Sequence, residues 1–333
     1  MEKNIISYDS CYIQASSSTV GNKEHFGPLG NYFDLYEEDE YFGCNNFQSA
    51  ETEMARRNMN ILFKKADISE EDISLCFGGD LLNQCAATNF ALRDTGIPYI
   101  GLYGACSTIA ESLICASVFV DNFVCRNALC MTSSHFCSAE RQYRFPLEYG
   151  STRTPTSQNT VTGAGAYLIS RKKSDVRIEE GLIGKIIDSN ISDPNNMGAA
   201  MANAAADTIT RFFCESRYTQ DDFDVICTGD LGFEGLEITK KLLESNGLYL
   251  SDKLYDCGEM IYDREKQDCN SGGSGCGCMA SVLASYFIEK IKKGELSRIL
   301  AVGTGALHNP CTILEKKSIP AVAHAVNICG GTK

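Results

Sequence analysis

The first half of the chain contains four short apolar runs and one longer apolar segment of helical length. The pattern predicts strands at 73–79, 97–102, 126–133 and 163–170, because each run is apolar, of strand length and bounded by turn-forming residues. A longer apolar segment at 107–120 predicts a buried helix between the second and third strands. Strands that alternate with helices are typical of an α/β fold with mostly parallel sheets covered by helices.

The same order of elements returns in the second half. The stretch 69–81 matches 219–231, and three pairs of polar residues within them share one separation: Ser69 with Thr219, Asp72 with Asp222, and Asp80 with Asp230. The turn at 104–108, which opens the first helix, corresponds to a turn at 275–279 that opens a helix at 280–291. A repeat of this length indicates a duplicated supersecondary unit.

Two later strands complete the match. The strands at 126–133 and 163–170 correspond to 298–305 and 321–329. Four matched blocks in one order predict two similar halves, 1–175 and 176–333. The match is interrupted by a long loop at 135–159 in the first half and by an insertion at 232–274 in the second.

Composition narrows the class of protein. Hydrophobic residues make up 44% of the 333 residues, as in globular proteins, and the formal net charge is −13. A nucleic-acid-binding protein needs a basic face, so no nucleic-acid partner is expected. The start of the chain has no apolar signal segment, and the longest apolar run, 113–120, is too short for a membrane span. We expect an intracellular, soluble protein that reaches a membrane only through a partner.

Cysteine is unusually frequent: the chain has 17, with four histidines and no tryptophan. An odd number in a long chain does not indicate a disulfide framework. Paired C-x-x-C spacings are absent, and Cys276 and Cys278 form a single C-x-C, so no structural metal is expected. Most cysteines lie in apolar runs, where they act as small buried hydrophobic residues in a reducing compartment.

One cysteine lies at a position suited to chemistry. In Gly104-Ala-Cys106-Ser-Thr108 it follows a predicted strand and opens the helix at 107–120. A helix N-terminus presents free N–H groups that bind anions and lower the pKa of a thiol. A duplicated α/β half with such a turn resembles the thiolase superfamily, which includes the ketoacyl synthases. The resemblance implies a thiolase-like αβαβα layered fold with two similar halves and mixed, mostly parallel sheets.

In that superfamily the second half supplies a His and an Asn, or a second His and Cys, as base and oxyanion donors. Here the corresponding turns contain Thr228-Gly-Asp230 and Gly273-Ser-Gly-Cys-Gly277. His308 and His324 lie elsewhere in the second half, and Cys329 precedes two glycines in a way that superficially resembles the second Cys of a thiolase. Cys106 therefore lacks its expected partners, and we interpret it as a relic nucleophile with no catalytic role.

The remaining motifs resemble the stage V sporulation protein AD family. The matching stretches are Val20–Gly30, Gly79–Gln84, Gly104–Thr108, Ser133–His135, Ala139–Arg144, Glu148–Gly150, Thr160–Gly163, Asp193–Gly198, Ala204–Thr208, Thr228–Leu231, Asp256–Gly258, Gly272–Cys276 and Ser318–Pro320.

The family resemblance implies binding and transport rather than turnover. It implies a non-enzymatic, soluble component of the SpoVA channel that binds dipicolinic acid or its calcium complex. Its integral-membrane SpoVA partners would form the channel for uptake in sporulation and release in germination. The protein would then be cytoplasmic or in the forespore, peripheral on the spore inner membrane, with no cofactor other than calcium carried by the ligand. The related enzymes also imply a homodimer.

Dipicolinate is a planar dianion, so its site needs hydrogen-bond donors, cations or Ca²⁺, and a flat apolar wall. Cys106, Ser107 and Thr108 could bind one carboxylate, or could only cap the helix. Asp80 and Asp230 end equivalent strands, where they could hold Ca²⁺ or cap the following segments.

Further candidates follow the strand at 126–133. Ser134 and His135 lie where the long loop opens, and Arg141 or Arg144 could pair with a ligand carboxylate. An interface salt bridge with Glu140 or Glu148 is the alternative for the two arginines.

Two other functions stay open. A Cys-dependent acyltransferase or ketoacyl synthase with an atypical active site would use Cys106 as nucleophile. A scaffold for membrane partners would keep the site only as a vestige.

Overall fold

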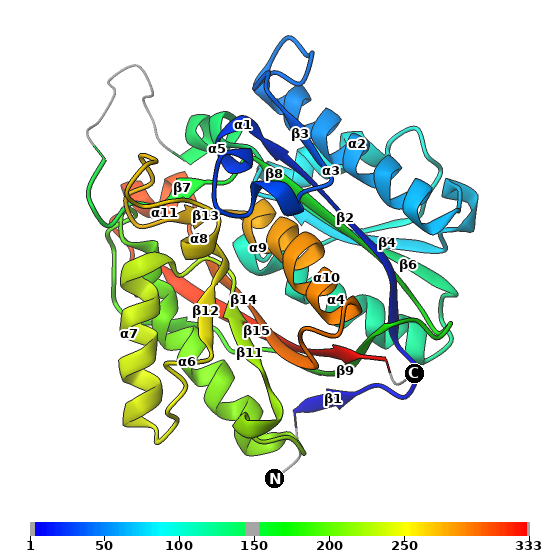
Figure 1. Cartoon of the computed structure of the whole chain (residues 1–333). Coiled ribbons are helices and arrows are strands. Elements are labelled where there is room, and N and C mark those ends of the chain that lie inside the picture. Colours follow the sequence, from blue (N-terminus) through cyan, green and yellow to red (C-terminus); the bar gives the residue numbers. More distant parts are fainter. Residues whose placement is uncertain (1–3, 144–152, 332–333) are drawn as a thin grey trace.

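The protein folds into five alternating layers of helices and strands (Figure 1). The computed structural model describes residues 4–143 and 153–331. Helices α2 (Phe47–Ala66) and α3 (Ala86–Leu92) form one outer layer, and α6 (Met197–Glu215) and α7 (Gly232–Ser245) form the other. Two layers of strands lie inside them, and a layer of helices separates the strands at the centre.

Each layer of strands has the same order. In the first, the order is β5 (Tyr99–Gly101), β4 (Leu75–Asp80), β6 (Asn127–Ser134), β8 (Gly163–Ser170) and β2 (Tyr12–Gly21). In the second, it is β12 (Leu254–Asp256), β11 (Val225–Thr228), β14 (Arg298–Ala306), β15 (Pro320–Gly330) and β9 (Val176–Leu182). The pair Tyr12–Arg177 joins β2 to β9, so the two layers are hydrogen-bonded as one sheet.

The sheet is mixed, as expected, and in each layer four of the five strands named above run in the same direction. Strands β4, β5 and β6 are parallel, as are β11, β12 and β14, but β8 and β15 are antiparallel to both of their neighbours within the layer. The physical reason is the path of the connections. Ser134 at the end of β6 pairs with Gly163 at the start of β8. The connection therefore joins two neighbouring strand ends on the same side of the sheet. A parallel neighbour would require a crossover connection back to the opposite end of the strands.

Short pieces complete the framework. Strand β1 (Ile5–Ser7) pairs with β9, β3 (Leu35–Glu37) with β2, and β10 (Ile187–Asp188) with β15. Strands β7 (Asn159–Thr160) and β13 (Gly273–Ser274) form a separate parallel pair. This pair links the loop of the first half to the turn that opens α9 (Cys276–Val282).

Buried helices form the central layer. Helix α4 (Thr108–Asp121) contacts β4 and β6 on one side and β14 and β15 on the other. Helix α9 contacts β6 and β8, and it continues through a π-helical turn at Leu283–Phe287 into α10 (Ile288–Lys292), which contacts β9 and β15. The expected helices at 107–120 and 280–291 are therefore present, although α9 begins four residues before the second prediction.

The repeated sequence motifs form matching local structures. Asp72 accepts a hydrogen bond from the Ser69 backbone N–H at 2.9 Å, and Asp222 accepts one from the Thr219 N–H at 2.8 Å. Both are capping boxes that precede a buried strand, β4 and β11 respectively. The stretch 232–274 contains α7 and β12, which pack as α3 and β5 do in the first half, together with α8 (Cys257–Met260). Much of this predicted insertion therefore belongs to the framework.

The cysteines are free thiols, and most of them are buried. This agrees with the expectation that they act as small apolar residues. No helix in the described part of the chain is long and apolar enough to cross a membrane.

Glycines allow the central helices to approach the strands closely, and this generates a prediction. A Cβ at Gly165 in β8 would lie 2.3 Å from the Ala280 carbonyl oxygen of α9. We expect Gly165→Ala to lower the free energy of unfolding by about 1–3 kcal/mol, because the backbone must move apart. The matched control is Gly330→Ala, whose Cβ would meet nothing nearer than 3.9 Å. Urea denaturation followed by circular dichroism measures both, and equal midpoints for the two variants would contradict the prediction.

Candidate functional site

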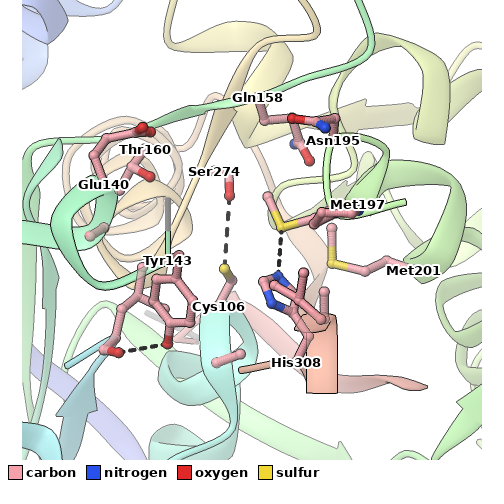
Figure 2. A pocket seen from close by; sticks show the side chains of 16 residues that line it. Cys106, Glu140, Tyr143, Gln158, Thr160, Asn195, Met197, Met201, Ser274 and His308 are labelled. Carbon is pink, nitrogen blue, oxygen red and sulfur yellow. Dashed lines mark hydrogen bonds between the residues drawn. The ribbon is translucent and has the colours of Figure 1, made fainter. Parts of the chain in front are cut away.

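A cavity of about 120 Å³ lies where turns from both halves meet at the N-terminal end of α4 (Figure 2). Its lining is formed by Leu81, Ala105, Cys106, Ala139, Glu140, Tyr143, Gln158, Thr160, Pro194, Asn195, Met197, Met201, Ser274, Ala306, His308 and Ile313.

Several separate elements supply this lining. Cys106 lies in a 3₁₀ turn (Ala105–Ser107) that leads into α4, and Glu140 and Tyr143 come from α5 (Phe136–Tyr143). Thr160 and Ser274 belong to the paired strands β7 and β13, while Met197 and Met201 form the first turns of α6. His308 and Ile313 follow β14, the latter in α11 (Pro310–Leu314). The site therefore exists only when both halves are folded together.

Cys106 points into this cavity (Figure 2). Its Sγ lies 4.0 Å from the Ser274 hydroxyl. The preceding residue, Ala105, has a left-handed backbone with φ of 53°. This conformation is costly for a residue other than glycine and is common at functional turns. The side chain of Cys106 is only 7% exposed.

The thiol of Cys106 is held in its neutral form. Burial raises its pKa well above the ordinary value, and the neighbouring carboxylate of Asp230 raises it further. Asp230 is itself buried, and burial raises its pKa to about 7. Its carboxylate accepts hydrogen bonds from Thr304 Oγ1 at 2.8 Å and from the Gly275 N–H at 3.1 Å. An anionic neighbour disfavours the thiolate that nucleophilic attack requires.

The two turns of the second half meet the Cys106 turn, as their place in the predicted repeat implies. The first contributes Asp230 and the second contributes Ser274. His324 and Cys329 lie away from the Cys106 turn. The Nδ1 atom of His324 accepts a hydrogen bond from the Gly184 N–H at 3.1 Å. Cys329 pairs with Arg298 at the start of β14, away from the end that lines the cavity.

Most of the other predicted residues lie behind the cavity wall. The hydroxyl of Ser107 donates to the Gly104 carbonyl, and that of Thr108 donates to the Ala105 carbonyl. The hydroxyl of Ser134 donates to the Val161 carbonyl at 2.7 Å and accepts from the Gly277 N–H at 3.0 Å. These three side chains stabilise the turns and are not among the described lining residues.

Asp80 is buried, and its carboxylate is hydrogen-bonded to residues that follow it closely in the chain. It accepts hydrogen bonds from the Leu82 N–H and from both the N–H and the hydroxyl of Thr88. Burial raises its pKa. Asp80 and Asp230 belong to separate hydrogen-bond networks. Within residues 4–143 and 153–331, no cluster of three or more His, Cys, Asp or Glu side chains is arranged to hold a metal ion.

His135 and Arg141 also face away from the cavity. His135 is fully buried beside Phe42 and Phe47, and its Nε2 lies 2.8 Å from the Glu40 carbonyl oxygen. The guanidinium of Arg141 lies over the Phe47 ring, 5.9 Å from its centroid. Arg144 and Glu148 lie outside the described residues.

The cavity contains residues that were not predicted as site residues. The Tyr143 hydroxyl donates to the Leu81 carbonyl at 2.7 Å, and His308 Nε2 lies 3.3 Å from Met197 Sδ. Gln158 Nε2 donates to the Asp230 and Gly273 carbonyls. The sequence did contain a signal for some of these residues, because they lie in the stretches that resemble the family. Asn195 and Met197 belong to the family stretch Asp193–Gly198, and Glu140 and Thr160 belong to two others.

The described lining is mostly neutral. Its ionisable side chains are Cys106, Glu140, Tyr143 and His308, and it includes no lysine or arginine. Glu140 lies 3.3 Å from the guanidinium of Arg153. The thioethers of Met197 and Met201 and the ring of Tyr143 provide apolar walls.

Solved structures of condensing enzymes share the fold. 3-oxoacyl-[acyl-carrier-protein] synthase III from Aquifex aeolicus matches with a TM-score of 0.60 and 12% identity, over 96% of this chain and 100% of that one. A variant of OleA from Xanthomonas campestris matches with a TM-score of 0.62 and 12% identity, over 97% and 99% of the two chains. At this identity the likeness concerns the fold alone, and it confirms the expected thiolase-like α/β class.

Sequence comparison gives a closer relationship. A curated relative, stage V sporulation protein AD from Bacillus subtilis (strain 168), is 40% identical over 315 residues, which cover 95% of this chain and 93% of the relative. The family model for stage V sporulation protein AD matches residues 2–329. The chain therefore belongs to the stage V sporulation protein AD family.

Proposed function

We propose that the protein binds dipicolinic acid, or its calcium complex, in the cavity at Cys106 and catalyses no reaction there. The observation that carries the proposal is a preformed cavity at the inherited nucleophile turn whose thiol is kept neutral by burial and by Asp230. Family membership supplies the role in stage V of sporulation. The cavity volume of about 120 Å³ is far larger than the roughly 10–15 Å³ that one water molecule needs.

The lining suits a flat ligand with polar groups at its edge. Tyr143, Met197 and Met201 offer apolar surface for a pyridine ring. The hydroxyls of Thr160 and Ser274 and the amide of Asn195 supply hydrogen-bond donors for carboxylate oxygens. Ligand sites typically combine such apolar walls with a few polar groups that fix orientation.

The charge of the lining bears on the form of the ligand. Among the described lining residues, none is a lysine or arginine that could neutralise a dianion. A calcium chelate of dipicolinate carries its own counter-charge, so it would enter at a smaller electrostatic cost. The proposal therefore includes both the free acid and its calcium complex.

The proposed setting follows from the family resemblance. The protein would act as the soluble component of the SpoVA channel, on the inner membrane of the spore through integral-membrane partners. A homodimer is also proposed. Strand β5 lies at the end of its sheet layer, and Ile100 within it and Tyr103 just after it are exposed by 39% and 51%. An exposed edge strand with apolar neighbours is suited to pairing with a second copy.

A second function rests on the Cys106 turn itself. The strained Ala105 and the start of α4 are features of a nucleophile turn, so an acyltransferase is the alternative. The raised pKa of Cys106 favours binding instead, because burial and the Asp230 carboxylate both disfavour the thiolate.

The first prediction from the proposed function concerns where dipicolinate binds. Asn195 lines the cavity and is partly exposed, so Asn195→Trp should fill the cavity without disturbing the core. We expect isothermal titration to show dipicolinate binding to the unmodified protein and an affinity lower by about tenfold or more in the variant. Asn203→Trp, on the exposed side of α6, is the matched control and should bind normally. No binding to the unmodified protein, with and without Ca²⁺, would refute the proposal.

A second prediction concerns the thiol. Removing the charge of Asp230 lowers the pKa of Cys106, because the thiolate no longer faces an anion. We expect Asp230→Asn to increase the alkylation rate of Cys106 by iodoacetamide severalfold at pH 8, measured peptide by peptide with mass spectrometry. Asp80→Asn is the control, since this buried carboxylate has its own partners in the other half. An unchanged rate in Asp230→Asn would show that its charge does not control the thiol.

The third prediction separates binding from catalysis. After incubation with acetyl-CoA, we expect intact-mass spectrometry to show no acyl adduct on the protein. A stoichiometric adduct that disappears in Cys106→Ala would establish the acyltransferase instead.

A further inference from the structure

His308 is a polar group of the cavity with no strong hydrogen-bond partner. Its Nδ1 atom is buried and has no hydrogen-bond partner within the described residues. Its Nε2 atom lies 3.3 Å from Met197 Sδ, and a thioether sulfur is only a weak acceptor. Buried polar atoms without a partner are rare in folded proteins, so each one calls for an explanation.

The surroundings do not supply that partner. The ring of Tyr143 meets the imidazole edge to face at 5.5 Å, while its hydroxyl is already engaged with the Leu81 carbonyl. Figure 2 shows the imidazole beside Cys106 and below Met197 in this view, with Tyr143 on the other side of Cys106. The side chain of Met197 is unbranched and has three rotatable bonds, so it can move aside for a better acceptor.

The charged and titratable groups around His308 can be named element by element. Helix α5 presents Glu140, which lies beside Arg153, and Tyr143. The 3₁₀ turn presents Cys106, with Asp230 behind it. Asp193 precedes Pro194 and Asn195 of the lining, and Cys311 lies in α11 with the lining residue Ile313. Burial lowers the pKa of His308, which makes the ring neutral at neutral pH in the absence of a ligand.

We infer that His308 is the residue through which the cavity recognises a carboxylate group of its ligand, and that the ring takes up a proton as the ligand binds. The inference rests on the proposed function, because it assigns this role toward a carboxylate ligand in the same cavity. A carboxylate oxygen replaces the Met197 sulfur at Nε2, the ring takes up one proton from solvent, and an imidazolium–carboxylate pair results. Such charge-assisted hydrogen bonds are about twice as strong as neutral ones.

The sign of the pH dependence follows. A bound carboxylate favours the charged imidazole and raises the pKa of His308 above its value without ligand. Binding therefore takes up protons, and affinity increases as the pH falls between the two pKa values. A merely structural histidine, whose protonation is the same with and without ligand, would give no such linkage.

The test is isothermal titration of sodium dipicolinate into the full chain, without calcium, at one pH near neutral in buffers of different ionisation enthalpy. We expect uptake of about one proton per ligand, visible as a dependence of the measured enthalpy on the buffer. His308→Gln should bind at least severalfold more weakly and show no uptake. His324→Gln is the matched control, since that histidine is also buried but does not line the cavity.

Two further measurements keep the outcome clear. Asp230→Asn tests the alternative site of proton uptake, because burial raises the pKa of Asp230 to about 7. Uptake that persists in His308→Gln but disappears in Asp230→Asn would overturn the inference. If His308→Gln does not fold, the imidazole resonances of the unmodified protein decide the matter, and with four histidines the spectrum is simple. One imidazole should shift toward the protonated form on addition of dipicolinate, and no shift would overturn the inference.

Different results would refute the proposed function and the role of His308. Absence of dipicolinate binding to the unmodified protein would refute the proposed function. Binding without proton uptake, or with unchanged uptake in His308→Gln, would refute only the role of His308.

Discussion

Close backbone contact between the central helices and the strands on either side is the constraint on which the site depends. A Cβ at Gly277, in the first turn of α9, would lie 2.1 Å from the Gly163 carbonyl oxygen of β8. A Cβ at Gly305 in β14 would lie 2.5 Å from the Gly104 carbonyl oxygen beside Cys106. Because these positions lack side chains, the turns before α4 and α9 can meet, and Ser274 is brought to within 4.0 Å of Cys106. The glycine contacts thus make one cavity from two halves.

This convergence is the basis of the proposal that the site binds a ligand and catalyses no reaction. The geometry of the nucleophile turn is kept, with its left-handed Ala105. The neighbouring turn supplies the buried carboxyl of Asp230, which opposes formation of the thiolate. The same arrangement leaves a mostly neutral pocket with apolar walls, in which His308 is poised to respond to a carboxylate. The inherited cleft is in this account used for recognition of a ligand.

Much of the framework could be predicted from the sequence. Strand β8 was predicted with its observed bounds, and the matched Ser69 and Thr219 motifs form matched capping boxes. The direction of β8 could not be predicted, because it depends on where the loop after Ser134 returns. Strand β12 has three residues and was hidden in an expected insertion.

The site was predicted less completely. Cys106 was recognised because its turn has a local signature, and the family stretches contain several other lining residues. Ser134 and His135 are instead fully engaged by nearby backbone groups. A polar residue at a strand end can bind a ligand or hydrogen-bond to nearby backbone groups. Only its burial and its hydrogen-bond partners distinguish these two roles. His308 was missed because its place in the cavity depends on the path of the chain after β14.

The most direct test of the central claim is a crystal structure of the protein soaked in calcium dipicolinate. The account predicts electron density for one pyridine ring in the cavity between Cys106, Tyr143 and Met197, with a carboxylate at His308 in place of the Met197 sulfur. Ligand density at another surface while this cavity keeps only water would contradict the claim.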